Sequence, residues 1–117
     1  MKALDHRPQV DYISDMDKDL VIAKLREHET ELRAAGVQAL SLFGSVARGE
    51  ATEASDVDLV ARLDPEITGR GFDYFSSLSD LKERLAAILG LPVDIVAEPI
   101  QKPRLEREIA RDRELAF

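Results

Sequence analysis

Short apolar runs alternate with longer segments of helical periodicity along this chain of 117 residues. The runs 37–43, 56–63 and 92–97 have the length and apolar content of buried strands, and glycine or proline stands near each of them. Over 17–35 and 72–89, apolar side chains recur every three or four residues, which predicts two helices. Strands interleaved with helices favour an α/β or α+β fold, in which helices flank a small mixed sheet.

The other segments are shorter or less regular. One or two helical turns from Ser45 are expected after the first strand, a loop over 67–71, and a charged helix over 103–115. Residues 1–16 show no period, so we expect an N-terminal arm there. Because a chain of this length suits one domain, residues 17–117 are expected to form a single domain.

The composition excludes several classes of function. Acidic residues outnumber basic ones by 23 to 16, and this excess argues against a protein that holds nucleic acid through its phosphates. The absence of cysteine excludes disulfides, thiolate metal sites and a cysteine nucleophile. No apolar run reaches the roughly 18 residues of a membrane span, and the polar N-terminus is unlike a secretory signal. We therefore expect a cytoplasmic protein without a membrane or direct nucleic-acid partner.

Two aspartates stand at the start of the second predicted strand. Asp56 and Asp58 are two residues apart, so on a strand their carboxylates point to the same side, while Val57 and Leu59 point into the core. Like charges so close together favour a cation between them, and oxygen ligands suit Mg²⁺ or Mn²⁺. The simpler alternative is a pair of acids that only face water.

A glycine-rich turn precedes these aspartates. If a helix begins at Gly44-Ser45, its free N–H groups form an anion site, to which the Ser45 hydroxyl adds a donor. The alternative is a turn glycine followed by an ordinary N-cap. Arg48, followed by Gly49, either reaches a phosphate or pairs with a nearby acid and holds the turn in shape.

A third aspartate interrupts the last apolar run. Asp94 lies between Val93 and Ile95, where an unpaired charge is expensive. If its strand lies beside the one that carries Asp56 and Asp58, three carboxylates meet at one point. Such a cluster requires two cations, and two cations close together are what in-line phosphoryl chemistry uses.

The stretch GSVARGEATEASDVDL, residues 44–59, resembles the signature of the nucleotidyltransferase superfamily, in which Gly-Ser, a spacer and Asp-x-Asp are followed by a third acid on a later strand. The internal spacing and the segment LPVDIVAE are most similar to the minimal nucleotidyltransferases (MNT) of prokaryotes. The resemblance covers about Leu20 to Leu115. The matching positions are Gly44, Ser45, Arg48, Gly49, Ser55, Asp56, Asp58 and Asp94.

This resemblance implies a fold related to the palm of DNA polymerase β, with ATP as substrate and two Mg²⁺ ions, or Mn²⁺ in their place. It implies that Asp56, Asp58 and Asp94 are catalytic and bind the metal. It further implies that the nucleotide is bound by Gly44, Ser45, Arg48 and Ser55, of which Ser55 also steadies Asp56 at the start of the strand.

The resemblance also implies a partner. Members of the MNT group are commonly paired with a small helical HEPN protein, an RNase toxin, and act as its antitoxin. Some transfer AMP from ATP to a tyrosine of the toxin.

Two other functions remain open. One is an antitoxin that neutralises its toxin by binding alone, without catalysis. The other is a nucleotidyltransferase for the hydroxyl group of a small molecule, although such relatives usually carry an added domain.

Overall fold

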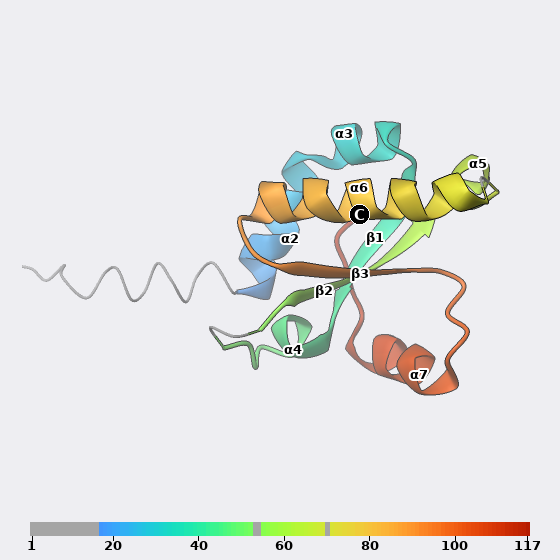
Figure 1. Ribbon diagram of the computed structural model, residues 1–117. Helices are drawn as coiled ribbons and strands as arrows, with labels where there is room; N and C mark the ends of the chain where they lie inside the picture. Colours follow the sequence, from blue (N-terminus) through green and yellow to red (C-terminus); the bar gives the residue numbers. More distant parts are fainter. Residues whose placement is uncertain (1–16, 53–54, 70) are drawn as a thin grey trace, which may run out of the picture.

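One mixed sheet organises the chain in a computed structural model that describes residues 17–52, 55–69 and 71–117 (Figure 1). The expected N-terminal arm, 1–16, lies outside the described residues. The four strands are arranged in the order β3-β2-β1-β4. β1 is antiparallel to β2 and β4, and β2 is parallel to β3. The strands are β1 Val37–Phe43, β2 Val57–Leu63, β3 Val93–Ala97 and β4 Glu114–Leu115.

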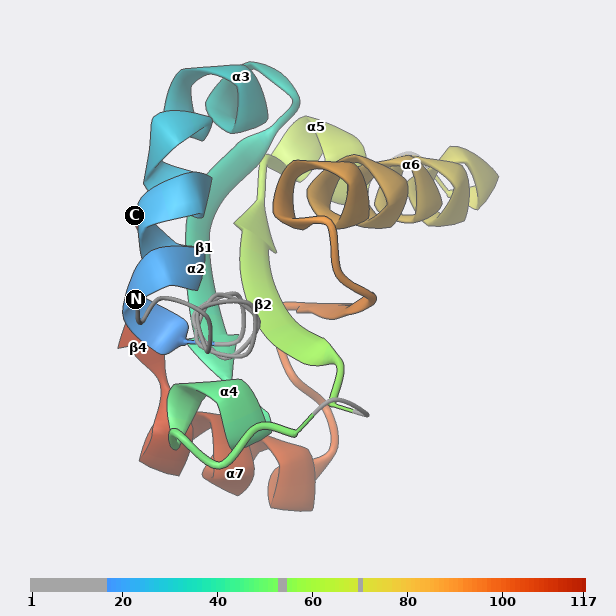
Figure 2. The same ribbon diagram turned by 90° about the vertical axis from the view of Figure 1, so that its left-hand side faces the viewer.

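Helices cover both faces of this sheet, so the predicted fold class is confirmed. Figure 1 shows α6 and α7 on opposite sides of the strands, and Figure 2 shows α2 and α3 beside β1. No helix in the described part of the chain is long and apolar enough to cross a membrane. The helices are α2 Lys18–Glu27, α3 Glu29–Ala34, α4 Gly44–Ala47, α5 Pro65–Thr68, α6 Phe72–Leu89 and α7 Pro103–Asp112.

Alternation along β2 divides the core into two clusters. Val57 and Leu59 are fully buried on the face covered by α2 and α6, as the sequence predicts. Val60 points to the other face, where it packs with Phe43 of β1 and Ile109 of α7. Because side chains two apart on a strand share a face, Asp58 lies on the α7 side of the sheet, with Val60.

The predicted tail helix over 103–115 is wrong at its C-terminal end. α7 ends at Asp112, and Glu114–Leu115 form β4, which pairs with Ser41 and Leu42 of β1. The charged sequence reads as helix, but pairing along the free edge of β1 outweighs this local preference. The Leu40 carbonyl accepts a hydrogen bond from the Ala116 amide at 2.8 Å, and Ala116 is completely buried.

Two other boundaries also differ from the prediction. The helix expected over 17–35 is interrupted at His28, which separates α2 from α3. Part of the loop expected over 67–71 is helical, because α5 covers Pro65–Thr68. The Asp64 carboxylate accepts a hydrogen bond from the Glu66 amide at 3.0 Å. An aspartate cap followed by proline is a common start of a helix. In the sequence, Pro65 is interpreted only as the end of the preceding strand, and α5 is therefore missed.

Candidate functional site

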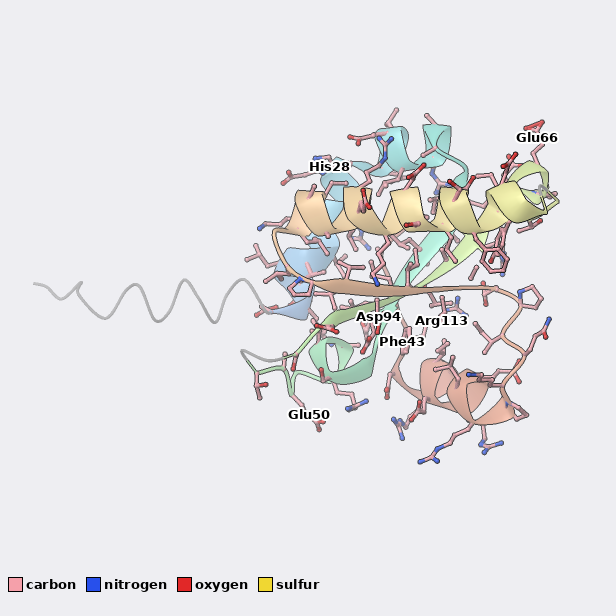
Figure 3. The ribbon with its side chains drawn as sticks, in the orientation of Figure 1. His28, Phe43, Glu50, Glu66, Asp94 and Arg113 are labelled. Carbon is pink, nitrogen blue, oxygen red and sulfur yellow. The ribbon has the colours of Figure 1, made fainter. Side chains whose placement is uncertain are left out.

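Two of the three predicted aspartates are direct neighbours across the sheet. Asp58 of β2 is paired in register with Asp94 of β3, and on its other side with Phe43, the last residue of β1. Neighbouring strands lie about 4.8 Å apart, so these two carboxylates leave the sheet side by side. Asp56 directly precedes β2, and its side chain is exposed. Figure 3 labels Asp94 on β3 and Phe43 at the end of β1, the two strands that flank β2 in the sheet.

The carboxylate of Asp58 lies in an unfavourable electrostatic environment. Burial raises its pKa above the usual 3.8, and the negative charges of Asp94 and Asp56 raise it further. Glu108 of α7 adds to this effect, whereas the guanidinium of Arg48 partly offsets it. The ionised form of Asp58 is therefore disfavoured in the metal-free protein, and a bound cation would stabilise it.

Asp94 has a partner on the neighbouring helix. Lys82 Nζ, on α6, lies 3.8 Å from Asp94 Oδ1, and both side chains are more than half exposed. Across 17–52, 55–69 and 71–117, no three acidic or histidine side chains stand close enough to hold a metal ion as they are. The donor set of Asp56, Asp58 and Asp94 consists of carboxylate oxygens only, which fits Mg²⁺ and not zinc.

Gly44 connects the turn after β1 to these carboxylates. Its φ is +77°, a left-handed conformation that favours glycine. A Cβ atom at this position would lie 3.1 Å from Cγ and 3.2 Å from Cβ of Asp58, and closer still to the carboxylate oxygen Oδ2. The turn backbone therefore packs directly against Asp58, a contact that the sequence does not reveal.

Ser45 occupies the first turn of α4 and is not its N-cap. The N-cap position is Phe43, which has no side chain able to accept a hydrogen bond, so no side chain caps α4. The Ser45 carbonyl accepts a hydrogen bond from the Glu50 amide at 2.8 Å. Within the described residues, the Ser45 hydroxyl makes no hydrogen bond, which leaves it available to a ligand.

Arg48 adopts the second of the two roles considered for it. Its Nε donates to Glu50 Oε1 at 2.9 Å, and its Nη1 donates to Asp112 Oδ2 at 2.7 Å. The Asp112 side chain is only 3% exposed, and Arg111 also donates to both of its oxygens. Hydrogen bonds from Arg111 and Arg48 lower the pKa of Asp112 to about 2, against the cost of burial. Arg48 thus ties α4 to α7.

Ser55 closes the turn that leads into β2. Its Oγ accepts a hydrogen bond from the Thr52 amide at 2.9 Å, and its own amide donates to the Thr52 carbonyl at 3.0 Å. These two hydrogen bonds hold the turn at Ser55, the residue immediately before Asp56.

Sequence reasoning missed Lys82 and Asp112. A charge within an apolar strand requires a partner, so Asp94 itself was a signal that a cation such as Lys82 lies nearby. Asp112 continues the spacing of Leu105 and Ile109, which places a carboxylate on the apolar face of α7. That position was a signal for a buried ion pair.

The nucleotidyltransferase domain family matches residues 25–116. The "Protein adenylyltransferase MntA" of Thermococcus cleftensis is 37% identical to this chain over 92 residues, a match that covers 75% of this chain and 84% of the relative.

Solved structures share the fold. One, described as a "putative minimal nucleotidyltransferase", superposes with a TM-score of 0.59 at 39% identity and covers 76% of this chain and 86% of its own. A second contains a tri-AMPylated HEPN toxin of Shewanella oneidensis in complex with an MNT antitoxin. It superposes with a TM-score of 0.51 at 19% identity, covers 80% of this chain and 70% of its own, and shows likeness of fold alone.

Proposed function

Because this chain belongs to the nucleotidyltransferase family, we propose that it transfers AMP from ATP to a hydroxyl group of a partner protein, in a reaction that depends on Mg²⁺. The partner is a HEPN toxin, the acceptor is a tyrosine, and the chain acts as the antitoxin. The observation that carries the proposal is the pairing of Asp58 with Asp94, directly beside the Gly44 turn.

The comparisons support both the reaction and the partner. The relative from Thermococcus cleftensis is named as a protein adenylyltransferase, and its match covers 75% of this chain. The structure from Shewanella oneidensis combines an antitoxin of this fold with a toxin that carries AMP. A tyrosine is a suitable acceptor because a phenol, with a pKa near 10, ionises far more easily than a serine alcohol.

In the proposed mechanism, Asp56, Asp58 and Asp94 hold the metal. When bound, Mg²⁺ neutralises the triphosphate and makes the acceptor hydroxyl easier to deprotonate. The backbone amides at Gly44 and the free hydroxyl of Ser45 bind the β- and γ-phosphates, which depart as pyrophosphate. Asp94 orients the attacking hydroxyl and receives its proton. Arg48 contributes by fixing α4 to α7, and Ser55 by ordering the turn before Asp56.

The electrostatics of Asp58 favour catalysis over binding alone. A protein that only blocks its toxin has no use for a carboxylate whose pKa is raised by burial and by two neighbouring aspartates. Perturbed carboxylates grouped in this way are typical of sites that perform chemistry.

Labelled ATP tests the proposed reaction. We expect a HEPN protein encoded beside this chain to acquire label from ATP labelled in the α-phosphate, and none from ATP labelled in the γ-phosphate. Chelation of Mg²⁺ should abolish the labelling. Label from the γ-phosphate would indicate a kinase, and label from neither position would contradict the transfer of any part of ATP.

A further inference from the structure

Unpaired positive charge gathers at the beginning of α7. Among the basic side chains of the described residues, those without an ion pair or a hydrogen bond are Lys24, Lys102, Arg104 and Arg107. The last three lie within 102–107 and are exposed. The whole chain carries a net charge of −7, so its unpaired cations are concentrated where an acidic ligand would find them.

A cavity of about 770 Å³ lies beside these cations, between α7 and the C-terminal ends of β2 and β3. Arg107 lines it, together with the apolar side chains of Pro99, Ile100, Ile109 and Ala110. Ile109 is only 3% exposed, whereas Arg107 is exposed. The cavity is therefore apolar in its depth and basic at the surface.

The charged side chains that line the cavity carry more positive than negative charge. Glu98 lies between two guanidinium groups, because Arg113 Nη2 is 3.2 Å from its Oε2 and Arg62 Nε is 3.6 Å from its Oε1. One carboxylate is thus shared by two cations. Glu106 and Arg107, both on α7, add one charge of each sign, so the excess of positive charge remains.

We propose that this cavity and the side chains of Lys102, Arg104 and Arg107, together called the α7 docking site, bind an acidic segment of the partner protein. An apolar side chain of that segment fills the cavity, and its carboxylates meet the cations. RNA fits less well, because the acidic chain as a whole repels a long polyanion, whereas a short segment meets only the local charge. The inference takes the identity of the partner, a HEPN protein, from the function proposed above and adds the surface that recruits it.

The α7 docking site lies on the same side of the sheet as Asp58, opposite α6 (Figure 1). Asp112, at the C-terminal end of α7, is hydrogen-bonded to Arg48, which follows the Gly44 turn. Arg104 is about 12 Å from Asp112 along the helix axis, at the usual rise per residue. A folded domain is wider than this separation, so a partner bound at the beginning of α7 also reaches the candidate site.

Steady-state kinetics with the HEPN partner as the varied substrate test the site through Arg107→Glu. We expect the KM for the partner to rise about tenfold, and kcat and the KM for ATP to stay within about twofold of the unmodified chain. A contact remote from the reacting atoms binds substrate and transition state equally, so its loss raises KM alone. Arg107→Lys keeps the charge and should keep the KM. An unchanged KM in Arg107→Glu would overturn the proposal.

Lys24→Glu is the matched control. Lys24 also lacks a partner among the described residues, but it lies on α2, which packs on the other face of the sheet. Both substitutions change the net charge by the same amount, so a general electrostatic effect would raise the KM equally in the two variants. We expect Lys24→Glu to change it by less than about twofold. Thermal unfolding checks that both variants fold, and equal rises in KM would contradict a local docking site.

Calorimetry of the two proteins without ATP separates this inference from the proposed function. The unmodified chain should bind the HEPN partner less tightly as salt is raised, and Arg107→Glu should bind it about tenfold more weakly with a smaller dependence on salt. If this pattern is found but the partner acquires no AMP, the proposed function fails and the docking site stands. If AMP is transferred and Arg107→Glu binds normally, the docking site fails and the function stands. Absence of binding by the unmodified chain would contradict both.

Two other occupants of the α7 docking site give distinct results. Arg107→Glu may be compared with the unmodified chain for binding of a single-stranded RNA oligonucleotide, and for self-association by sedimentation. Loss of RNA binding would identify a nucleic-acid site, and loss of self-association would identify a contact between copies of this chain. Either loss, with binding of the HEPN partner unchanged, would overturn the proposal.

Discussion

Asp58→Asn is expected to lower the rate of AMP transfer by about a thousandfold, because it removes a metal-binding charge from the centre of the site. The same change should leave the metal-free protein at least as stable at neutral pH. Asparagine keeps the shape of the side chain but does not carry the charge that burial, Asp94 and Asp56 disfavour. Activity and thermal unfolding, measured on the same preparations, test both expectations.

The stability effect of Asp58 depends on pH in a defined direction. Its pKa in the folded protein lies above the usual 3.8, so folding favours its protonated form. Well below pH 3.8 the carboxyl group is protonated in both the folded and the unfolded states, and the variant should gain nothing from the lost charge. As the pH rises through the pKa of the folded protein, the unmodified chain loses stability relative to Asp58→Asn.

Mg²⁺ should reverse this order, because it stabilises the folded chain that keeps Asp58 and has little effect on the variant. Asp80→Asn, on an exposed part of α6 outside the site, is the matched control and should change neither activity nor stability appreciably. Transfer at an undiminished rate by Asp58→Asn would refute the role given to this carboxylate.

A methyl group at Gly44 should inactivate the protein, whereas the same group at Gly49 should not. Both glycines have positive φ, +77° at Gly44 and +74° at Gly49, so either alanine costs about 1–3 kcal/mol of backbone strain. Only at Gly44 does the new Cβ meet the Asp58 side chain, since at Gly49 the described residues, apart from its two chain neighbours, place no atom within 4 Å. This crowding adds about 1–3 kcal/mol at Gly44 and displaces the carboxylate.

The comparison of Gly44→Ala with Gly49→Ala therefore isolates the contact with Asp58. We expect Gly44→Ala to lower both the unfolding temperature and the affinity for Mn²⁺, measured by paramagnetic resonance without ATP. Gly49→Ala should lose some stability and keep the metal affinity. Equal metal affinities in the two variants would mean that the turn does not support Asp58.

The sequence predicts the central pair of carboxylates because charge within an apolar strand is conspicuous. Asp94 interrupts the run 92–97, and a strand next to Asp56 and Asp58 was the arrangement expected for it. The structure places Asp94 in register with Asp58. The predicted limits of β1 are also confirmed, since Gly36 and Gly44 bound an uninterrupted apolar run.

The partners of these groups depend on tertiary contacts that leave little trace in a local pattern. Arg48 could not be assigned from sequence, because its partner Asp112 is 64 positions away and is buried at the C-terminal end of α7. In the sequence, Lys82 is one of several charges on an amphipathic helix. Its ion pair with Asp94 becomes evident only when β3 is known to lie beside α6. The short β4 is missed for the same reason, since its two residues form a strand only against the free edge of β1.

The intact mass of the HEPN partner distinguishes catalysis from blockade. The partner is incubated with ATP, Mg²⁺ and a small fraction of an equivalent of this chain, which is then removed. We predict that nearly every partner molecule becomes heavier by one or more AMP units on tyrosine and stays inactive, because a catalyst acts many times. An unchanged mass, together with inhibition that requires equal amounts of the two proteins and proceeds without ATP, would contradict the assignment as a transferase.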